Sequence, residues 1–120
     1  MSDDVYDGIP VVDLPVVDVD IPDPTHLRRS LRYSNAVDID PVSAIEAALD
    51  PRGLIARDVK SRTGEAIRVV GYSPSADRVL VVVLLPDEHP PRGLWHVATA
   101  WPASRGLREA YADENEEETP

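Results

Sequence analysis

Two segments in the first half of the chain have the spacing of amphipathic helices, and each begins with Asp-Pro. Aspartate caps the free amides of a helix N-terminus, and proline fits the first turn because it needs no amide partner there. The first segment starts at Asp23-Pro24 and ends near Ser34-Asn35. The second starts at Asp40-Pro41 and ends at the turn residues 50–53. The residues that we expect on the apolar face of the second helix are Val42, Ile45, Ala48 and Leu49.

The second half of the chain has a different pattern, with predicted strands at residues 66–73, 79–85 and 94–101. The middle strand is apolar on both faces, which is typical of a central strand. Residues 54–59 are a candidate fourth strand at one edge, and residues 104–112 form a last helix after a serine cap. The sequence therefore predicts an α+β fold with two N-terminal helices, an antiparallel meander of three to four strands, and a C-terminal helix.

Acidic residues gather at the two ends of the chain. Residues 1–24 contain seven acidic residues, no basic residue and four prolines, so we interpret them as an extended arm. Inside the arm, valines alternate with Asp18 and Asp20, and prolines on both sides allow at most a short edge strand there. We expect an acidic arm over 1–24, a single domain over 25–112, and an acidic tail over 113–120.

The net charge and amino-acid composition of the chain exclude several classes of protein function. The formal charge is −10, but residues 25–109 hold 12 basic and 10 acidic residues, so the middle does not exclude RNA binding. There is no cysteine, which excludes disulfides and a cysteine nucleophile. The longest apolar run has seven residues and the N-terminus is acidic, so we expect a cytoplasmic protein without membrane contact. The sequence contains no nucleotide-binding, metalloprotease or esterase motif, and we predict no cofactor and no metal site.

Basic and aromatic residues are the candidates for a binding site. Arg68 and Tyr72 share one face of a predicted strand, and the C-terminal helix carries further candidates at helical spacing. Together they would border a groove in which guanidinium groups hold an RNA backbone and rings stack on bases. The alternative, which spacing alone favours, is that the arginines pair with acidic residues and the tyrosines cap the core. The residues of the proposed groove are Lys60, Arg62, Arg68, Tyr72, Trp101, Arg105, Arg108 and Tyr111.

The last predicted strand carries the remaining candidate. Trp95 and Trp101 are six residues apart, so strict alternation puts them on one face with Val97 and Thr99. His96 then lies on the opposite face, as a general acid or base or as a half-buried polar residue. A metal site around His89 is disfavoured because the spacing of ligands is not matched.

Several short motifs follow one another in a characteristic order. They are Lys60-Ser61-Arg62-Thr63-Gly64, Arg68-Val69-Val70-Gly71-Tyr72-Ser73, Arg78-Val79-Leu80-Val81-Val82-Val83, Ala98-Thr99-Ala100-Trp101-Pro102-Ala103-Ser104, and then Arg105, Arg108 and Tyr111. Over about residues 40–112 this order resembles the BrnT-type toxins, which are small bacterial ribonucleases with a RelE-like fold. The resemblance implies mRNA cleavage and a DNA-binding antitoxin as partner. This chain has Trp101-Pro102 where the family has tandem arginines.

Two functions follow as hypotheses. The first is a toxin-like protein, held by a cognate antitoxin, that binds mRNA and cleaves it without metal. In it Arg68, Arg108, His96 and Tyr111 would be catalytic, and Lys60, Arg62, Tyr72, Trp101 and Arg105 would bind RNA. The alternative is a non-catalytic regulatory or protein-binding module, which the overall negative charge and Trp101-Pro102 favour. A third, more remote hypothesis makes the acidic arm a nucleic-acid mimic that binds a basic partner.

Overall fold

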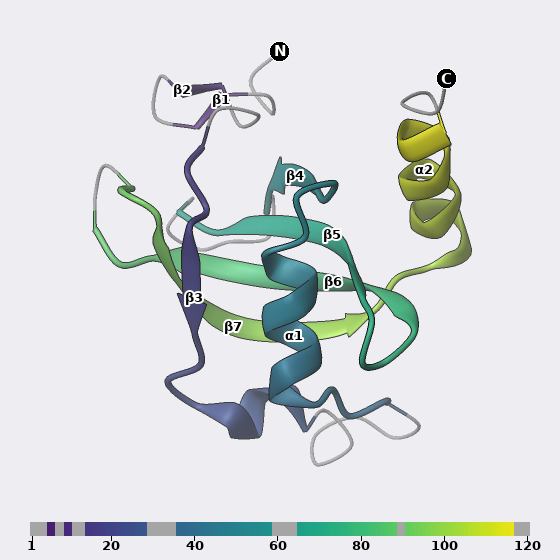
Figure 1. Ribbon diagram of the computed structural model, residues 1–120. Coiled ribbons are helices and arrows are strands. Elements are labelled where there is room, and N and C mark those ends of the chain that lie inside the picture. Colours follow the sequence, from purple (N-terminus) through teal and green to yellow (C-terminus); the bar gives the residue numbers. More distant parts are fainter. Residues whose placement is uncertain are drawn as a thin grey trace.

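The computed structural model describes residues 5–6, 9–10, 14–28, 36–58, 65–88 and 91–116 (Figure 1). The centre of the described fold is one sheet with a helix across it (Figure 1). In chain order the elements are β1 (Val5–Tyr6), β2 (Ile9–Pro10), β3 (Asp18–Asp20), the 3-10 helix η3 (Pro24–Leu27), α1 (Pro41–Ala48), β4 (Leu54–Arg57), β5 (Ile67–Ser73), β6 (Arg78–Pro86), β7 (Leu94–Pro102) and α2 (Arg105–Glu116).

Among the described residues, five strands form a mixed sheet in the order β3-β7-β6-β5-β4. The neighbours from β4 to β7 are antiparallel, whereas β3 joins the outer edge of β7 in parallel. The predicted fold class is therefore wrong. The described residues hold two α-helices, one in the middle of the chain and one near its C-terminus, and the sheet is neither purely antiparallel nor limited to four strands.

The first predicted helix is replaced by the short η3. Asp23 caps it as expected and accepts a hydrogen bond from the amide of Thr25 at 3.1 Å. The helical conformation ends at Arg28, which has φ −91° and ψ 69°. The carbonyl of Leu27 accepts its hydrogen bond from the amide of Ile39 at 2.9 Å, so a contact from outside the turn uses the carbonyl that a continuing helix would need. The rest of that predicted helix, residues 29–35, lies outside the described residues.

Helix α1 lies across one face of the sheet and approaches β5 very closely (Figure 1). A Cβ atom added to Gly71 of β5 would lie 2.0 Å from the carbonyl oxygen of Ala47 in α1. Such an approach demands small side chains, and the buried residues of α1 are Ser43, Ala44, Ala47 and Ala48. The predicted apolar face is thus wrong in part, because Val42 is 55% exposed and Ile45 and Leu49 pack only at the margin of the core.

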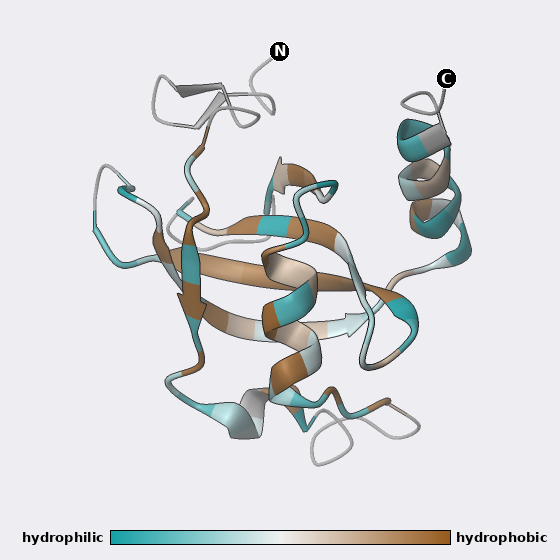
Figure 2. Ribbon diagram, viewed as in Figure 1, coloured by the Kyte–Doolittle hydropathy of each residue, from teal (hydrophilic) through white to brown (hydrophobic). Residues whose placement is uncertain are grey.

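The main core fills the space between α1 and the sheet, where the central strands are strongly hydrophobic (Figure 2). It also includes two residues from the predicted acidic arm, Leu14 and Val19, which are 5% and 6% exposed. The strand residues of this core are Val19, Ile67, Val69, Leu80, Val82, Leu84, Trp95, Val97 and Ala100. Part of the acidic N-terminal segment is therefore integrated into the sheet.

A β-bulge divides the two tryptophans between the faces of the sheet. The register of β6 and β7 shifts between Val83 and Leu84, where one extra residue of β7 goes unpaired. As a result, Trp95 is fully buried beneath α1, whereas Trp101 belongs to the cluster on the opposite face. The prediction that both rings share one face is wrong, because an extra residue inverts the alternation along the strand.

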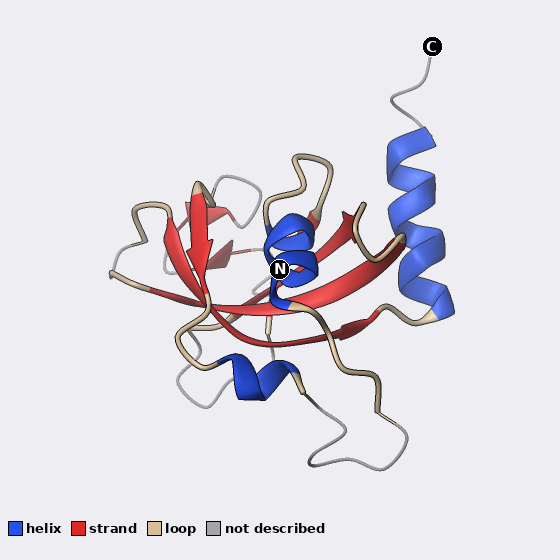
Figure 3. Ribbon diagram, turned by 60° about the horizontal axis from the view of Figure 1, so that its bottom comes forward, coloured by secondary structure: helices blue, strands red, loops and turns tan. Residues whose placement is uncertain are grey.

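Helix α2 stands beside the sheet, away from α1 (Figures 1 and 3). Its residues are exposed apart from Tyr111 and Asn115, among those whose side chains the structure describes. Tyr111 packs with Trp101 against a second, smaller cluster that includes Val70, Val81 and Ala103. The described residues include no helix with the length and hydrophobicity needed to cross a membrane.

Candidate functional site

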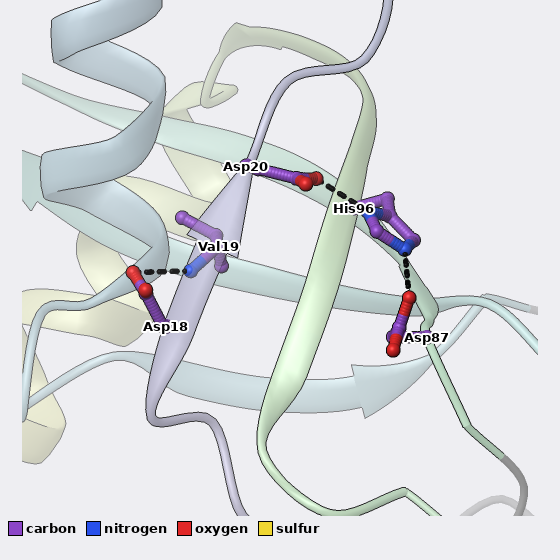
Figure 4. Close-up of polar contacts among 5 residues, drawn as sticks. All are labelled: Asp18, Val19, Asp20, Asp87 and His96. Atoms are coloured by element: carbon purple, nitrogen blue, oxygen red, sulfur yellow. Dashed lines mark hydrogen bonds and ion pairs between the residues drawn. The ribbon is translucent and has the colours of Figure 1, made fainter.

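His96 contacts two carboxylates at the edge where β3 joins β7. The parallel register places Asp20 of β3 opposite His96 of β7. The imidazole Nδ1 lies in contact with Oδ1 of Asp20, and its Nε2 lies 2.8 Å from Oδ1 of Asp87, just after β6 (Figure 4). One imidazole therefore bridges the edge strand to the turn between β6 and β7.

The carboxylates on both sides favour the charged imidazolium. The hydrogen bond to Asp20 is the main cause that raises the pKa of His96 above its ordinary value of 6.5, and partial burial opposes it. The hydrogen bond to Asp87 and the charges of both aspartates act in the same direction as Asp20. Both ring nitrogens therefore contact a carboxylate of the same chain in this structure.

Backbone and core contacts hold the same N-terminal segment next to β7. The amides of Val17 and Asp18 both donate to the carbonyl of Gly93, at 2.8 and 3.0 Å. The indole Nε1 of Trp95 donates to the carbonyl of Pro15 at 2.7 Å. Gly93 has a φ of 126°, and an added Cβ would lie 2.8 Å from Val17 Cγ2, so a glycine is needed where the segment passes.

A small hollow adjoins the histidine. Its volume is about 190 Å³, and its lining is mostly apolar. The residues that line it are Pro22, Asp23, Leu85, His96, Val97 and Ala98. The hollow lies just after β3 along the chain, because Pro22 and Asp23 form one side of its lining.

Arg68, an arginine of the predicted RNA groove, contacts two other side chains of the same chain. Its Nε lies 3.1 Å from Oδ1 of Asp58, and its guanidinium carbon lies 5.1 Å from the centre of the Trp101 ring. The structure thus brings two predicted groove residues together, as a cation over an aromatic ring. The side chain of Arg68 is 29% exposed.

The two predicted groove tyrosines also bond to acidic residues. The hydroxyl of Tyr72 donates to Asp77 at 2.5 Å, and that of Tyr111 donates to Asp50 at 2.5 Å. Burial, followed by the bond to Asp50, raises the pKa of Tyr111 to about 12. Asp50 also accepts a hydrogen bond from the amide of Tyr72 at 2.9 Å, so one carboxylate joins β5 to α2.

The remaining predicted site residues are spread over the surface or lie outside the described chain. On α2, Arg105 pairs with Glu109 at 3.1 Å, and Arg108 is exposed. Lys60 and Arg62 lie outside the described residues. Tyr72 and Tyr111 do share an open hollow of about 430 Å³ with Asp50, Arg52 and Pro74. His96 lies elsewhere, at the β3–β7 edge, so the structure places the predicted residues in separate regions.

Sequence reasoning missed Asp20, Asp87 and Asp50 as partners of the candidate residues. Asp20 is visible in the sequence as the acidic member of an alternating segment, but its partner is 76 residues away. Only the pairing of β3 with β7 reveals that relation. Among the described residues, no group of three or more His, Asp or Glu side chains is arranged to hold a metal ion.

Comparisons of the chain with protein-family models, with curated proteins and with solved structures found no match.

Proposed function

We propose that this chain is a non-catalytic protein-binding module that takes up an extended segment of another protein along the outer edge of β7. In this structure the chain's own β3 covers the first part of that edge, at Leu94–His96. Binding of a partner would replace this segment with a strand of similar pattern, as in other cases of strand addition to a sheet edge.

The observation that carries this proposal is the way β3 joins the sheet. It adds in parallel, pairs over only three residues, and comes from the N-terminal side of the fold, next to residues that form no part of the main sheet. Backbone groups at a sheet edge bind any extended chain, and side-chain pockets select among them. Here the selective contacts are the burial of Leu14 and Val19 in the core and the contact of Asp20 with His96.

The engagement of the candidate catalytic groups supports binding over catalysis. Arg68, Tyr72, Tyr111 and His96 each contact an acidic residue of the same chain. Tyr72 and Tyr111 share one hollow, but neither Arg68 nor His96 lines it. The contacts of Arg68, Tyr72 and Tyr111 include no residue of β3, so displacement of β3 would leave them in place.

A labelled peptide with the sequence of residues 14–22 tests the proposal on the full chain. Val19→Asp places a charge where Val19 is 6% exposed, so it should displace the chain's own β3 and open the edge to the peptide. Val17→Asp is the matched control, because Val17 is 73% exposed and its replacement leaves the core untouched. We expect peptide binding to Val19→Asp, and at least about tenfold weaker binding to Val17→Asp, because a tethered segment competes at high effective concentration.

The milder Val19→Ala provides the same comparison if Val19→Asp does not fold. A folded Val19 variant whose β3 amides exchange freely, yet which binds no peptide, would show that the edge does not take up a strand. Equal binding to the Val17 and Val19 variants would likewise contradict the proposal, since the peptide would then be bound elsewhere.

Ribonuclease activity stays a second candidate because Arg68 and Trp101 adjoin on the sheet face opposite α1. A cation and a ring at this distance could hold a phosphate and a base of RNA. Incubation of the purified chain with RNA, with and without EDTA, tests this candidate. Metal-independent cleavage that Arg68→Ala abolishes would favour it, and intact RNA at stoichiometric protein would exclude it.

A further inference from the structure

His96 is bonded to two carboxylates that belong to different parts of the molecule. Asp87 belongs to the body of the sheet, since it follows β6 directly and its amide donates to the carbonyl of Leu94 at 3.0 Å. Asp20 belongs to the segment that covers the edge. The contact of the ring with Asp87 is internal to the docking surface, and the contact with Asp20 is the one that an exchanged strand would have to replace.

The position of Asp20 differs from that of the other acidic residue of β3. The carboxylate of Asp18 accepts a hydrogen bond from the amide of Val19 at 2.9 Å and is directed away from the imidazole (Figure 4). Asp20 points at the ring, in line with the register that pairs it with His96. A strand that docks here in the same register therefore presents one side chain to His96, two residues after the position of Asp18.

Protonation decides how many carboxylates the ring can bind. An imidazolium donates through both nitrogens, whereas a neutral imidazole donates through only one. With Asp87 fixed in the body of the sheet, the neutral ring lacks the second charged hydrogen bond that holds the covering strand. The ring is 28% exposed, so it can exchange its proton with solvent.

We propose that His96 selects a strand with a carboxylate at the position of Asp20, and that loss of its proton loosens that strand. This inference rests on the proposed strand-binding function of the β7 edge and names the partner's chemistry and its control. The partner segment is extended and carries an apolar side chain followed directly by an acidic one, like Val19 and Asp20.

The charged groups around the imidazole are those expected if protonation of His96 controls how tightly the strand is held. Asp20 approaches it from β3, Asp87 from the turn after β6, and Asp23 lines the adjoining hollow. The nearest described basic side chain of the same turn, Arg92, is paired with Glu88 at 3.0 Å. The pKa of His96 is raised in the folded chain, so the strand is held fully below about pH 6.5 and loosens as the pH rises through the raised pKa.

Three peptides and a pH series test the inference on the full chain with Val19→Asp. The first has the sequence of residues 14–22, the second carries Asp20→Asn, and the third carries Asp18→Asn as matched control. We expect the first and third to bind about three- to tenfold more tightly at pH 6 than at pH 9, as a charged but partly exposed hydrogen bond would give. The second should bind weakly at both pH values.

The outcomes separate this inference from the proposed function. If all three peptides bind equally at every pH, the edge takes up strands but His96 does not select them, and the inference fails alone. If none binds, the strand-binding function fails with it. The full chain with Val19→Asp and His96→Gln keeps the other two histidines, at positions 26 and 89. If peptide binding to this variant still depends on pH, the role of His96 is overturned. If the variant binds the peptide equally at both pH values, that role is supported.

Discussion

Replacing Gly71 with alanine tests how closely α1 packs on the sheet. The new Cβ would lie 2.0 Å from the carbonyl oxygen, 2.9 Å from the carbonyl carbon and 3.2 Å from the Cα of Ala47. All three are backbone atoms, so no side-chain rotation relieves the overlap. The end of α1 has to move away from β5 instead.

The size of the effect follows from these distances. Ordinary contact begins near 3.4 Å, so an oxygen at 2.0 Å must be displaced by about 1.4 Å. Overpacking in a rigid core costs about 1–3 kcal/mol, and contact with backbone belongs at the upper end of that range. The shift also disturbs Asp50, whose amide donates to the carbonyl of Ala47 at 3.3 Å. We therefore expect Gly71→Ala to lose about 3 kcal/mol, out of about 5–15 kcal/mol for a domain of this kind.

Gly106→Ala is the matched control, since it makes the same chemical change in α2. Apart from its chain neighbours and the backbone of its own helix, nothing lies within 4 Å of the position of its Cβ. Alanine is preferred over glycine in helices by up to about 1 kcal/mol, so this variant should be neutral or slightly more stable.

Urea unfolding followed by tryptophan fluorescence measures both variants, because Trp95 is buried in the core beneath α1. The unfolding midpoint of Gly71→Ala should fall well below that of the unaltered chain. Equal midpoints for Gly71→Ala and the unaltered chain would refute the close packing of α1 on β5.

Two further predictions concern the ties between elements. Tyr111→Phe removes the hydroxyl that donates to Asp50, so it should cost about 0.5–1.5 kcal/mol in urea unfolding. An absorbance titration of the variant should lack the tyrosine that titrates with a pKa of about 12, and loss of a tyrosine that titrates at the ordinary value of 10.0 would contradict the bond. Glu46 accepts hydrogen bonds from the Ser75 amide and from the hydroxyls of Ser73 and Ser75, which hold its pKa below the ordinary value of 4.5. A lowered pKa stabilises the fold above about pH 4.5, and this contribution is lost as the pH falls through the lowered pKa. Glu46→Gln should therefore be less stable than the unaltered chain at pH 7, and the difference in stability should shrink in acid. A stability difference that does not depend on pH would contradict this role of Glu46.

Local sequence signals predicted the strands of the meander well. The segments expected at 66–73, 79–85 and 94–101 correspond to β5, β6 and β7, and the candidate edge strand at 54–59 corresponds to β4. Alternation, turn residues and an all-apolar central strand are encoded over short stretches of chain, which explains this agreement. The same holds for Asp40-Pro41 and Ser104, which stand directly before or at the start of the two helices.

Features that depend on long-range contacts were not predictable in this way. The pairing of β3 with β7 joins residues 76 apart, and the bulge in β7 moves Trp101 to the other face without a glycine or proline to mark it. The small-residue face of α1 is explained by Gly71, which the helix sequence alone does not reveal. For the candidate site, His96 was found but its partners were not, since Asp20 and Asp87 become neighbours only when the edge strand is in place.

Residue-resolved hydrogen exchange of the unaltered full chain tests most directly whether β3 leaves the edge of β7 as a unit. The amides of Val17 and Asp18 donate to Gly93, whereas Val82 lies in the central strand and is fully buried. If the strand is displaceable, the first two amides exchange through a local opening with a lower free energy and a weaker urea dependence than Val82. If all three exchange with the free energy and urea dependence of global unfolding, β3 is a fixed part of the fold and the proposed strand-binding function is contradicted.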